Sequence, residues 1–370
     1  MKLYSGILLL IPFFSGALAA GQTTPQSFEQ LSRTAQQAYE AGHDDQATEL
    51  YSDAVKLRPD WAEGWWALGM IDYEHDRYPQ CRDSLTRMVA LDASAAPGWA
   101  LLGLCEFRTK QFDLSFQHLK KAHMLVPVKE PGGQLMDVAN YHLALLLTRQ
   151  GAFELAQEIF VRVAMKARDN PEMMFGSGLA SLRMPILPTD VPADQRDVVT
   201  MAGKTFWDLA IQPPEQAEAD FKALIAAYPK FPNVHYFYGT FLGARHPEQS
   251  AAEFLAELKV NPDSVPARVQ LALRYIVESK PKNALQYARE AVALSPDSVG
   301  SQLALGEALR ASGDDEHALA AYLAAERLDS ESPKIRLYLA NAYRALGRTD
   351  DVRREQAEYR RLEGEQQNWP

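Results

Sequence analysis

Apolar residues recur along most of the chain at positions i, i+3, i+4 and i+7, the spacing that places them on one face of an α-helix. The apolar runs come in pairs. A turn that contains Gly or Asp separates the first run from the second, and the second ends at a proline or an Asp-Ser pair, as in "LSPDS" at 294–298. The pattern therefore predicts a succession of helical hairpins.

The hairpins repeat with a step of 34 residues. The stretch "GWWALGMIDYEHDRY" (64–78) returns as "GWALLGLCEFRTKQF" (98–112), so that Trp65 and Gly69 recur as Trp99 and Gly103. A fixed period of this kind is typical of solenoids, in which each repeat buries its apolar face against its neighbours. Further pairs in the same register are Tyr51 and Leu85, Leu271 and Leu305, Ala284 and Ala318, Ala291 and Ala325, and Pro262 and Pro296.

Small residues are expected where the two helices of a hairpin cross, because a bulky side chain would hold the axes apart. Gly69 with Cys81, and Gly306 with Ala318, are predicted to be such pairs.

The order of an aromatic residue, Leu-Gly, a tyrosine-like position, Ala, an aromatic residue, Ala and Pro resembles the tetratricopeptide repeat (TPR). The resemblance is most specific in the repeats that start at 62, 96, 265 and 299. It implies an all-α fold, a right-handed superhelix of helical hairpins whose first helices line a concave groove. The repeats start near Phe28, Ala62, Ala96, Asp137, Val198, Pro232, Val265, Val299 and Pro333.

The stretch "MPILPTDVPADQRD" (184–197) interrupts the repeat after a lone first-type helix at 171–182. Prolines at 185, 188 and 192 occupy the place of a second helix, where they would remove hydrogen bonds and clash with the preceding turn. We therefore expect the superhelix to be interrupted near 183–197, between an N-terminal stack (28–183) and a C-terminal stack with a capping helix (198–363). The Pro-rich connecting loop (184–197) is either a plain connection or a hinge or docking loop.

The first twenty residues are typical of a secretory signal peptide. Lys2 precedes an apolar stretch, Leu3 to Phe14, and Ala17-Leu18-Ala19 gives the pattern of a cleavage site near Ala19 or Ala20. The prediction is a signal peptide at 1–20 and an exported protein, periplasmic or secreted. The alternative is an uncleaved membrane anchor, for which the uncharged stretch between Lys2 and Gly21 is at the short end.

Composition and motifs argue against several classes of function. A formal net charge of −10 argues against a nucleic-acid partner, which would favour a basic surface. The sequence holds no HExxH motif, no Walker loop, no GxGxxG after a strand and no Gly-x-Ser-x-Gly elbow. We therefore expect neither an enzyme nor a protein with a metal or cofactor, and we interpret the paired carboxylates Asp44-Asp45 and Asp314-Asp315 as helix caps.

The two cysteines, Cys81 and Cys105, fall on helices that are neighbours in the TPR arrangement. A disulfide is chemically allowed in an exported protein. The sequence favours the interpretation that both cysteines are free and act as small buried hydrophobic residues. A disulfide requires close Cα atoms and matching Cβ directions, which sequence does not show.

Trp66 directly follows Trp65, which has the core aromatic position, and lies about 100° further around the helix. In the TPR arrangement that direction is the concave face. Exposed apolar stripes often mark partner sites, and aromatic residues are frequent interface anchors. The alternative is that the protein covers this stripe itself. The predicted partner-binding groove consists of Trp66, Met70, Tyr73, Leu104, Phe107, Tyr141 and Leu145.

These inferences favour an exported, non-enzymatic TPR scaffold that binds a peptide or protein partner in its concave groove. The runner-up is a membrane-anchored assembly factor that retains its N-terminal helix, so that membrane contact would come only through this segment. An enzyme with catalytic residues in the 183–197 loop is the least favoured, since the loop offers no nucleophile, base and metal together.

Overall fold

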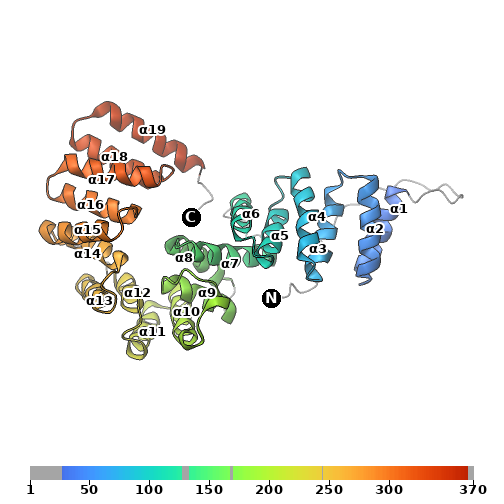
Figure 1. Ribbon diagram of the computed structural model, residues 1–370, viewed down its shortest axis with the longest axis horizontal. Coiled ribbons are helices and arrows are strands. Elements are labelled where there is room, and N and C mark those ends of the chain that lie inside the picture. The colour runs from blue at the N-terminus through green and yellow to red at the C-terminus, as the bar shows by residue number, and fades with distance from the viewer. Residues whose placement is uncertain (1–26, 127–132, 167–169, 244, 366–370) are drawn as a thin grey trace, which may run out of the picture. The chain divides into compact units, whose positions relative to one another are not determined.

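The computed structural model describes residues 27–126, 133–166, 170–243 and 245–365. These residues form nineteen α-helices and two short 3-10 helices with no strand among them, which confirms the predicted all-α fold class (Figure 1). The chain divides into two compact units, Met1–Leu147 (unit 1) and Thr148–Pro370 (unit 2). The predicted signal peptide at 1–20 lies outside the described residues.

Unit 1 is built of helical hairpins that pack in chain order. The hairpins are α1–α2, α3–α4 and α5–α6, and α2 packs on α3 as α4 packs on α5. The helices are α1 (Phe28–Glu40), α2 (Asp44–Leu57), α3 (Ala62–Glu74), α4 (Tyr78–Leu91), α5 (Ala96–Arg108), α6 (Phe112–Leu125) and α7 (Gly133–Arg149), of which α7 ends just beyond the unit boundary.

Unit 2 continues with the same kind of hairpin, clearest in α12–α13, α14–α15, α16–α17 and α18–α19. Its α-helices are α8 (Phe153–Ala164), α9 (Pro171–Ser181), α10 (Arg196–Ile211), α11 (Pro214–Ala227), α12 (Val234–Leu242), α13 (Pro247–Val260), α14 (Val265–Val277), α15 (Pro281–Leu294), α16 (Val299–Ala311), α17 (Asp315–Leu328), α18 (Pro333–Ala345) and α19 (Thr349–Glu365). The 3-10 helices are η1 (Pro188–Asp190) and η2 (Ala193–Gln195).

The turn inside a hairpin has a recurring backbone geometry. Its residue with positive φ, in steps of 34, is Gly42, Asp76 and Lys110 in unit 1, and Ser279, Gly313 and Gly347 in unit 2. The amide that follows this residue donates back to the last turn of the first helix, for example from Arg77 N to Asp72 O at 2.7 Å. This C-terminal cap satisfies the end of the first helix and reverses the chain into the second.

Glycines allow the two helices of a hairpin to approach closely. A Cβ added to Gly69 would lie 2.6 Å from Leu85 Cγ, and one added to Gly306 would lie 2.3 Å from the Tyr322 ring. Both glycines are therefore at crossings, as predicted. The side chain that fills each crossing comes from one helical turn beyond the predicted partners, Cys81 and Ala318.

The Pro-rich segment lies within a pair of packed helices and does not separate two units. α9 and α10 pack against each other, and the segment with η1 and η2 connects them. A Cβ added to Gly203 of α10 would lie 2.0 Å from the carbonyl oxygen of Met174 in α9. The two expected stacks, 28–183 and 198–363, therefore do not coincide with the two compact units of the structure. The boundary between these units falls between Leu147 and Thr148. Prolines show where a helix cannot continue, but they do not show where contacts between hairpins are lost.

The connecting loop is itself packed. Leu187 and Val191 are buried. The Arg196 guanidinium donates to the carbonyl oxygen of Pro188 at 3.2 Å and lies 4.6 Å above the ring of Phe175. These contacts favour a plain connection over a hinge.

Glu257 of α13 caps the N-terminus of α12. Its carboxylate accepts hydrogen bonds from the amides of Asn233 (2.9 Å) and Tyr236 (3.3 Å), and the residue is fully buried. The side chain of Asn233 does not cap the helix, since its Nδ2 donates instead to Leu182 O at 2.9 Å. A carboxylate from the second helix of the hairpin therefore satisfies the first.

Glu257→Leu is expected to lower the free energy of unfolding by about 2–4 kcal/mol, because the backbone amides of Asn233 and Tyr236 lose their acceptor inside the protein. Glu257→Gln keeps one acceptor and should cost less. Urea denaturation and hydrogen exchange of the α12 amides would measure both. Equal exchange of these amides in wild type and Glu257→Leu would contradict the capping role.

α19 covers the C-terminal end of unit 2. Arg336 of α18 is buried and pairs with Glu355 of α19 at 3.2 Å, and also with Glu326 of α17. Its guanidinium donates to Ser330 O at 2.8 Å. Leu362 is buried, whereas Arg353 and its ion-pair partner Asp350 are exposed, so α19 presents one face to the core and a charged face to solvent.

Candidate protein-binding surfaces

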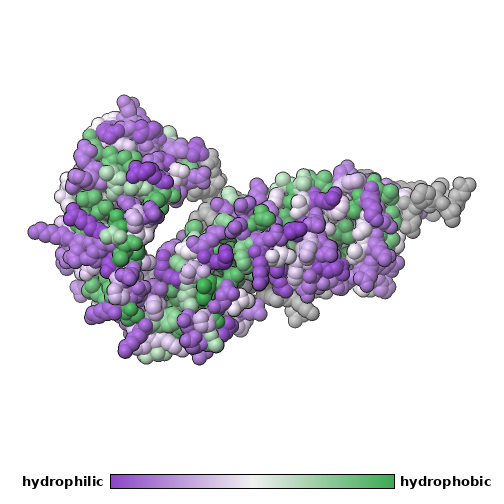
Figure 2. All heavy atoms as spheres, viewed as in Figure 1, coloured by the Kyte–Doolittle hydropathy of each residue, from purple (hydrophilic) through white to green (hydrophobic). Residues whose placement is uncertain are grey.

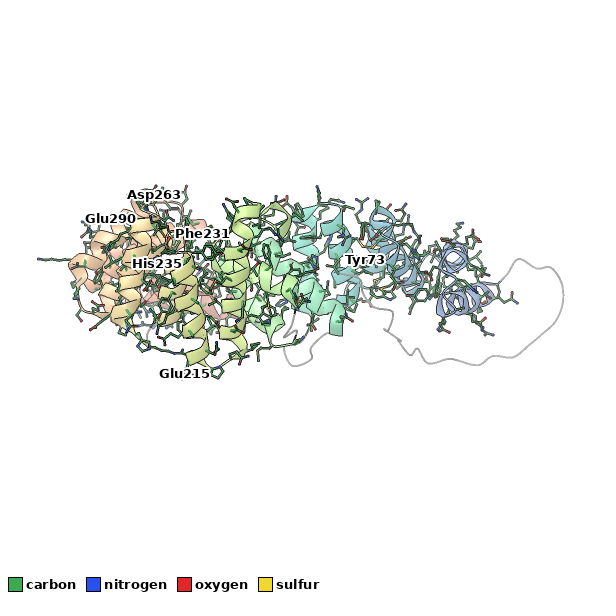
Figure 3. All side chains as sticks on the ribbon, turned by 90° about the horizontal axis from the view of Figure 1, so that it is seen from below. Tyr73, Glu215, Phe231, His235, Asp263 and Glu290 are labelled. Atoms are coloured by element: carbon green, nitrogen blue, oxygen red, sulfur yellow. A yellow bond between two sulfur atoms is a disulfide. The ribbon has the colours of Figure 1, made fainter. Side chains whose placement is uncertain are left out.

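The seven residues of the predicted groove lie on α3, α5 and α7. All seven residues belong to unit 1, on first helices that alternate with second helices along the chain. Tyr73 of α3 is labelled in Figure 3. Their exposure divides them into two sets. Trp66, Met70, Tyr73 and Phe107 are partly exposed. Leu104, Tyr141 and Leu145 are buried, with 1%, 7% and 3% of their surface accessible.

The prediction that Leu104, Tyr141 and Leu145 line an open groove is therefore not supported. Leu104 follows four buried residues on α5, and this helix contacts α3, α4 and α6. Helical register assigned Leu104 the direction of Met70, but register does not report how many neighbours surround a helix. The buried residues add to the packing of the protein and offer no surface to a partner.

Aromatic rings pair across the two helices of two successive hairpins in unit 1. Tyr73 contacts Tyr78 (ring centroids 5.8 Å apart), and Phe107 contacts Phe112 (5.4 Å). The Arg108 guanidinium lies 4.8 Å above the Tyr78 ring and so joins α5 to α4. We call Tyr73, Tyr78, Phe107 and Phe112 the aromatic row.

The aromatic row reaches α7 through His142, whose ring lies 4.6 Å from that of Phe107 in an edge-to-face arrangement. Burial lowers the pKa of His142 to about 4, against which the hydrogen bond to Val138 O acts only in part. The imidazole is therefore neutral at physiological pH and behaves as one more aromatic ring of this surface.

The paired tryptophans have different roles. The Trp65 indole N–H donates to Pro59 O at 2.9 Å, and Trp99 makes the equivalent bond to Ala93 O at 2.9 Å. These two residues fasten the start of their hairpins to the preceding turn, as their shared position in the repeat predicts. Trp66 lies beside the first of them and is partly exposed.

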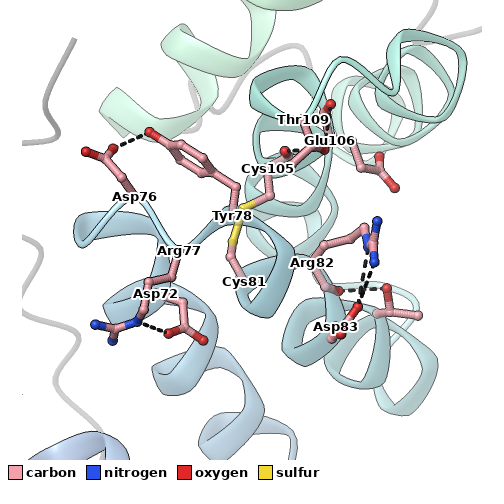
Figure 4. Close-up of a disulfide and its surroundings, with 12 residues drawn as sticks. Asp72, Asp76, Arg77, Tyr78, Cys81, Arg82, Asp83, Cys105, Glu106 and Thr109 are labelled. Atoms are coloured by element: carbon pink, nitrogen blue, oxygen red, sulfur yellow. Dashed lines mark hydrogen bonds and ion pairs between the residues drawn. A yellow bond between two sulfur atoms is a disulfide. The ribbon is translucent and has the colours of Figure 1, made fainter. Parts of the chain in front are cut away.

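Cys81 and Cys105 form a disulfide (Figure 4). The interpretation of two free, buried thiols is thus wrong. Packing of α4 on α5 brings the Cα atoms to 6.4 Å, within the range that a disulfide can bridge. Both residues are fully buried. The bond joins the second helix of one hairpin to the first helix of the next.

Unit 2 has an exposed apolar surface that sequence reasoning missed. Leu273 and Val277 on α14 are 36% and 76% exposed, and Leu337 on α18 is 44% exposed. Figure 2 shows hydrophobic residues between hydrophilic ones along this unit. The sequence holds a signal for two of these residues, since Leu337 occupies the position of Trp66 in its repeat and Leu273 occupies that of Met70. A search centred on aromatic residues overlooked these aliphatic ones.

Polar residues lie next to this apolar surface. A pocket of about 530 Å³ is lined by Glu307, Arg310, Asp315, Tyr338, Asn341 and Ala345. Both carboxylate oxygens of Glu307 accept from Arg310 at 3.1 Å, and Tyr322 donates to it at 2.6 Å. Burial alone would raise the pKa of Glu307, but these hydrogen bonds outweigh it and lower the pKa.

Histidine–carboxylate pairs connect the helices of several hairpins. His118 Nδ1 lies 2.8 Å from Glu106, and His235 Nδ1 lies 2.6 Å from Glu253 (His235 is labelled in Figure 3). Asp314 caps α17 as predicted, whereas Asp44 pairs with His75 at 2.8 Å and makes no cap. The described residues contain no group of three or more His, Cys, Asp or Glu side chains that could hold a metal ion. The histidine–carboxylate pairs therefore hold helices together.

Within the described ranges, no helix combines the length and apolar character that a membrane span requires.

The family model described as "TPR repeat" matches residues 306–347. None of the curated proteins matches the chain. Solved structures that are similar include a fragment of MamA from Desulfovibrio magneticus RS-1, at 20% identity and a TM-score of 0.38, over 45% of this chain and 92% of that one. The Cut9–Hcn1 assembly of the APC/C is 12% identical with a TM-score of 0.35, over 90% of this chain and 72% of that one. The P58(IPK) TPR domain is 15% identical with a TM-score of 0.31, over 87% and 99%.

Proposed function

We propose that this chain, a tetratricopeptide-repeat protein, is an exported, non-enzymatic scaffold that binds a protein or peptide partner on the first helices of unit 1. The observation that carries the proposal is the aromatic row, which has a ring pair in each of two successive hairpins and includes the partly exposed Tyr73 and Phe107. Arg108 joins the two hairpins over Tyr78, and Phe107 contacts His142 of α7. Trp66 and Met70 extend the surface along α3. Helical repeats of this family bind other proteins through such surfaces.

The chemistry of the surface suits a partner with apolar anchors. Tyrosine, tryptophan and phenylalanine supply most of the binding energy in many interfaces, since each buries a large rigid ring at little entropic cost. The rings here are held in place by neighbouring rings and by Arg108, so little order has to be gained on binding.

Export is supported by the disulfide. Buried disulfides form and persist in oxidising compartments and are rare in the cytosol. Together with the apolar stretch Leu3 to Phe14 and the A-x-A pattern, the pair Cys81–Cys105 favours export with cleavage near Ala19 or Ala20. A membrane-anchored assembly factor would retain the same stretch, and mass spectrometry of the mature N-terminus separates the two. An intact Met1 in the membrane fraction would favour the anchor.

The triple variant Trp66→Ala, Tyr73→Ala, Phe107→Ala is expected to lose partner binding by about 2–4 kcal/mol, roughly 30-fold or more. The measurement is cross-linking and quantitative recovery of partners on tagged mature protein, followed by titration of the recovered partner. The matched control is Leu57→Ala, Leu91→Ala, which removes exposed apolar side chains from second helices of the same unit. Equal recovery by the triple variant and wild type would exclude this surface, provided that both unfold at the same temperature.

A further inference from the structure

One side-chain hydrogen bond recurs at the start of the first helices. A residue in the first turn of the helix donates to the carbonyl oxygen six residues earlier, in the turn that precedes the helix. The pairs are Trp65 with Pro59 (2.9 Å), Trp99 with Ala93 (2.9 Å), Gln302 with Pro296 (2.8 Å) and Arg336 with Ser330 (2.8 Å). In α12 the same place is taken by His235, labelled in Figure 3, whose Nε2 lies 3.2 Å from Pro229 O. The bond fastens each of these five helices to the turn before it.

Of these five donors, only His235 changes its protonation near neutral pH. Tryptophan, glutamine and arginine always carry the proton that they donate, whereas an imidazole Nε2 does so in only some of its states. The other ring nitrogen, Nδ1, lies 2.6 Å from Glu253 Oε2 on α13. A backbone carbonyl and an ionised carboxylate can only accept. Both contacts are therefore hydrogen bonds at the same time only when His235 is a doubly protonated imidazolium.

The groups around His235 favour this protonated form. The hydrogen bond to Glu253 raises the pKa of His235, and the carbonyl of Pro229 and the charge of Glu257 act in the same direction, against partial burial of the ring. Both carboxylates belong to α13, and Lys230, the charged residue of the turn at 228–233, is exposed. Since the folded-state pKa lies above the ordinary value of about 6.5, the stabilisation is complete below that pH and is lost as pH rises through the raised pKa.

The turn that His235 fastens joins α11 to α12, and these two helices also meet through aromatic rings. Phe221 of α11 is fully buried, and its ring centroid lies 4.6 Å from that of Phe237 and 4.7 Å from that of Phe241 on α12. Phenylalanine does not titrate, so this contact persists when His235 is neutral. Loss of the His235 bond therefore loosens the turn without unfolding the joint.

We propose that His235 is a pH-sensitive switch at the joint between α11 and α12. When protonated, it holds the turn at 228–233 and α13 to α12 at once. When neutral, it keeps only one of its two partners, Glu253 or Pro229, and the joint becomes more mobile. The starts of α3, α5, α16 and α18 do not respond in this way, because their donors keep their protons. The switch is independent of the aromatic row of unit 1.

The protonation of His235 is tested on the full mature chain with nitrogen-15-labelled histidine. Long-range proton–nitrogen NMR spectra between about pH 5 and about pH 9 report both ring nitrogens, and the signals missing from His235→Gln assign this residue. His235 is expected to carry a proton on each nitrogen at about pH 6 and to titrate above about 6.5. Titration at or below this ordinary value would overturn the proposal.

Hydrogen exchange, corrected for the intrinsic pH dependence of the exchange chemistry, tests whether protonation holds the joint. The amides of Phe231 and Val234, which are hydrogen-bonded within the turn, are expected to lose about threefold to tenfold in protection between about pH 6 and about pH 9. His235→Gln has a permanent donor, as Gln302 is at the same position of α16, and should keep this protection at both pH values. His235→Phe has no donor and should show the low protection at both.

Two comparisons control for general effects of pH. The first turn of α16, fastened by Gln302, should keep its protection throughout, which also shows that each variant is folded. His118→Gln removes the pair with Glu106 in unit 1 and should leave the response of the α11–α12 joint unchanged. The proposal is overturned if wild type and His235→Gln respond to pH alike, or if His118→Gln abolishes the response.

Discussion

Alanine at Gly203 is expected to break the packing of α9 on α10. The new Cβ would lie 2.0 Å from the carbonyl oxygen of Met174 and 2.7 Å from its carbonyl carbon. Both atoms belong to backbone held in a helix, so that no side-chain rotation relieves the overlap and the two helices must separate. We expect a loss of about 4 kcal/mol or more in the free energy of unfolding, in the range reserved for severe core changes.

The matched control for this glycine is Gly300→Ala. Gly300 also lies in a helix, α16, but there an added Cβ would meet nothing closer than Ser298 Oγ at 3.8 Å. This substitution should stabilise the protein by up to about 1 kcal/mol, because alanine is the better helix former. Urea denaturation followed by circular dichroism compares the two, and hydrogen exchange locates the change. Unchanged protection of α9 and α10 amides in Gly203→Ala would refute the close-crossing argument.

The second large effect concerns the disulfide. Its cysteines are 24 residues apart, and closing a loop of that length removes about 3 kcal/mol of chain entropy from the unfolded state. Reduction should therefore lower the stability of unit 1 by about this amount and increase hydrogen exchange in α4 and α5. The transition of unit 2 should not move, since stability in a repeat array is a sum over neighbours.

The variant Cys81→Ala, Cys105→Ala separates the bond from its surroundings. It should unfold like the reduced wild type, and reductant should have no further effect on it. If reduction leaves the unfolding of wild-type unit 1 unchanged, the bond contributes little and its support for an oxidising compartment weakens with it.

The regular repeats were the part of the fold that sequence could predict. The starts predicted near Phe28, Ala62, Ala96, Val265, Val299 and Pro333 are the first residues of α1, α3, α5, α14, α16 and α18. Here periodicity, turn residues and helix starts all agree. The agreement ends at the predicted start near Val198, because that stretch forms the helix that packs on α9 rather than the first helix of a new hairpin.

The surfaces were harder to predict than the helices. Helical register gave the direction of Leu104, but its burial depends on helices distant in sequence. The disulfide required a Cα separation that only the packing of α4 on α5 provides. The exposed apolar residues of α14 were missed for a different reason, since Leu273 and Val277 occupy the positions of Met70 and Glu74 and not that of the aromatic Trp66.

α19 also covers the end of the hairpin array to which a second copy of the chain could otherwise add. A hairpin array is made of parts that fit onto copies of themselves, and two bare ends would let chains add head to tail into an open filament. α19 covers one such end, since it buries Leu362 and Glu355 and keeps Arg353 and Asp350 in water. A chain truncated before Thr349 would therefore leave the last hairpin uncovered. We expect such a chain to polymerise, because a second copy could pack on that hairpin as one hairpin packs on the next.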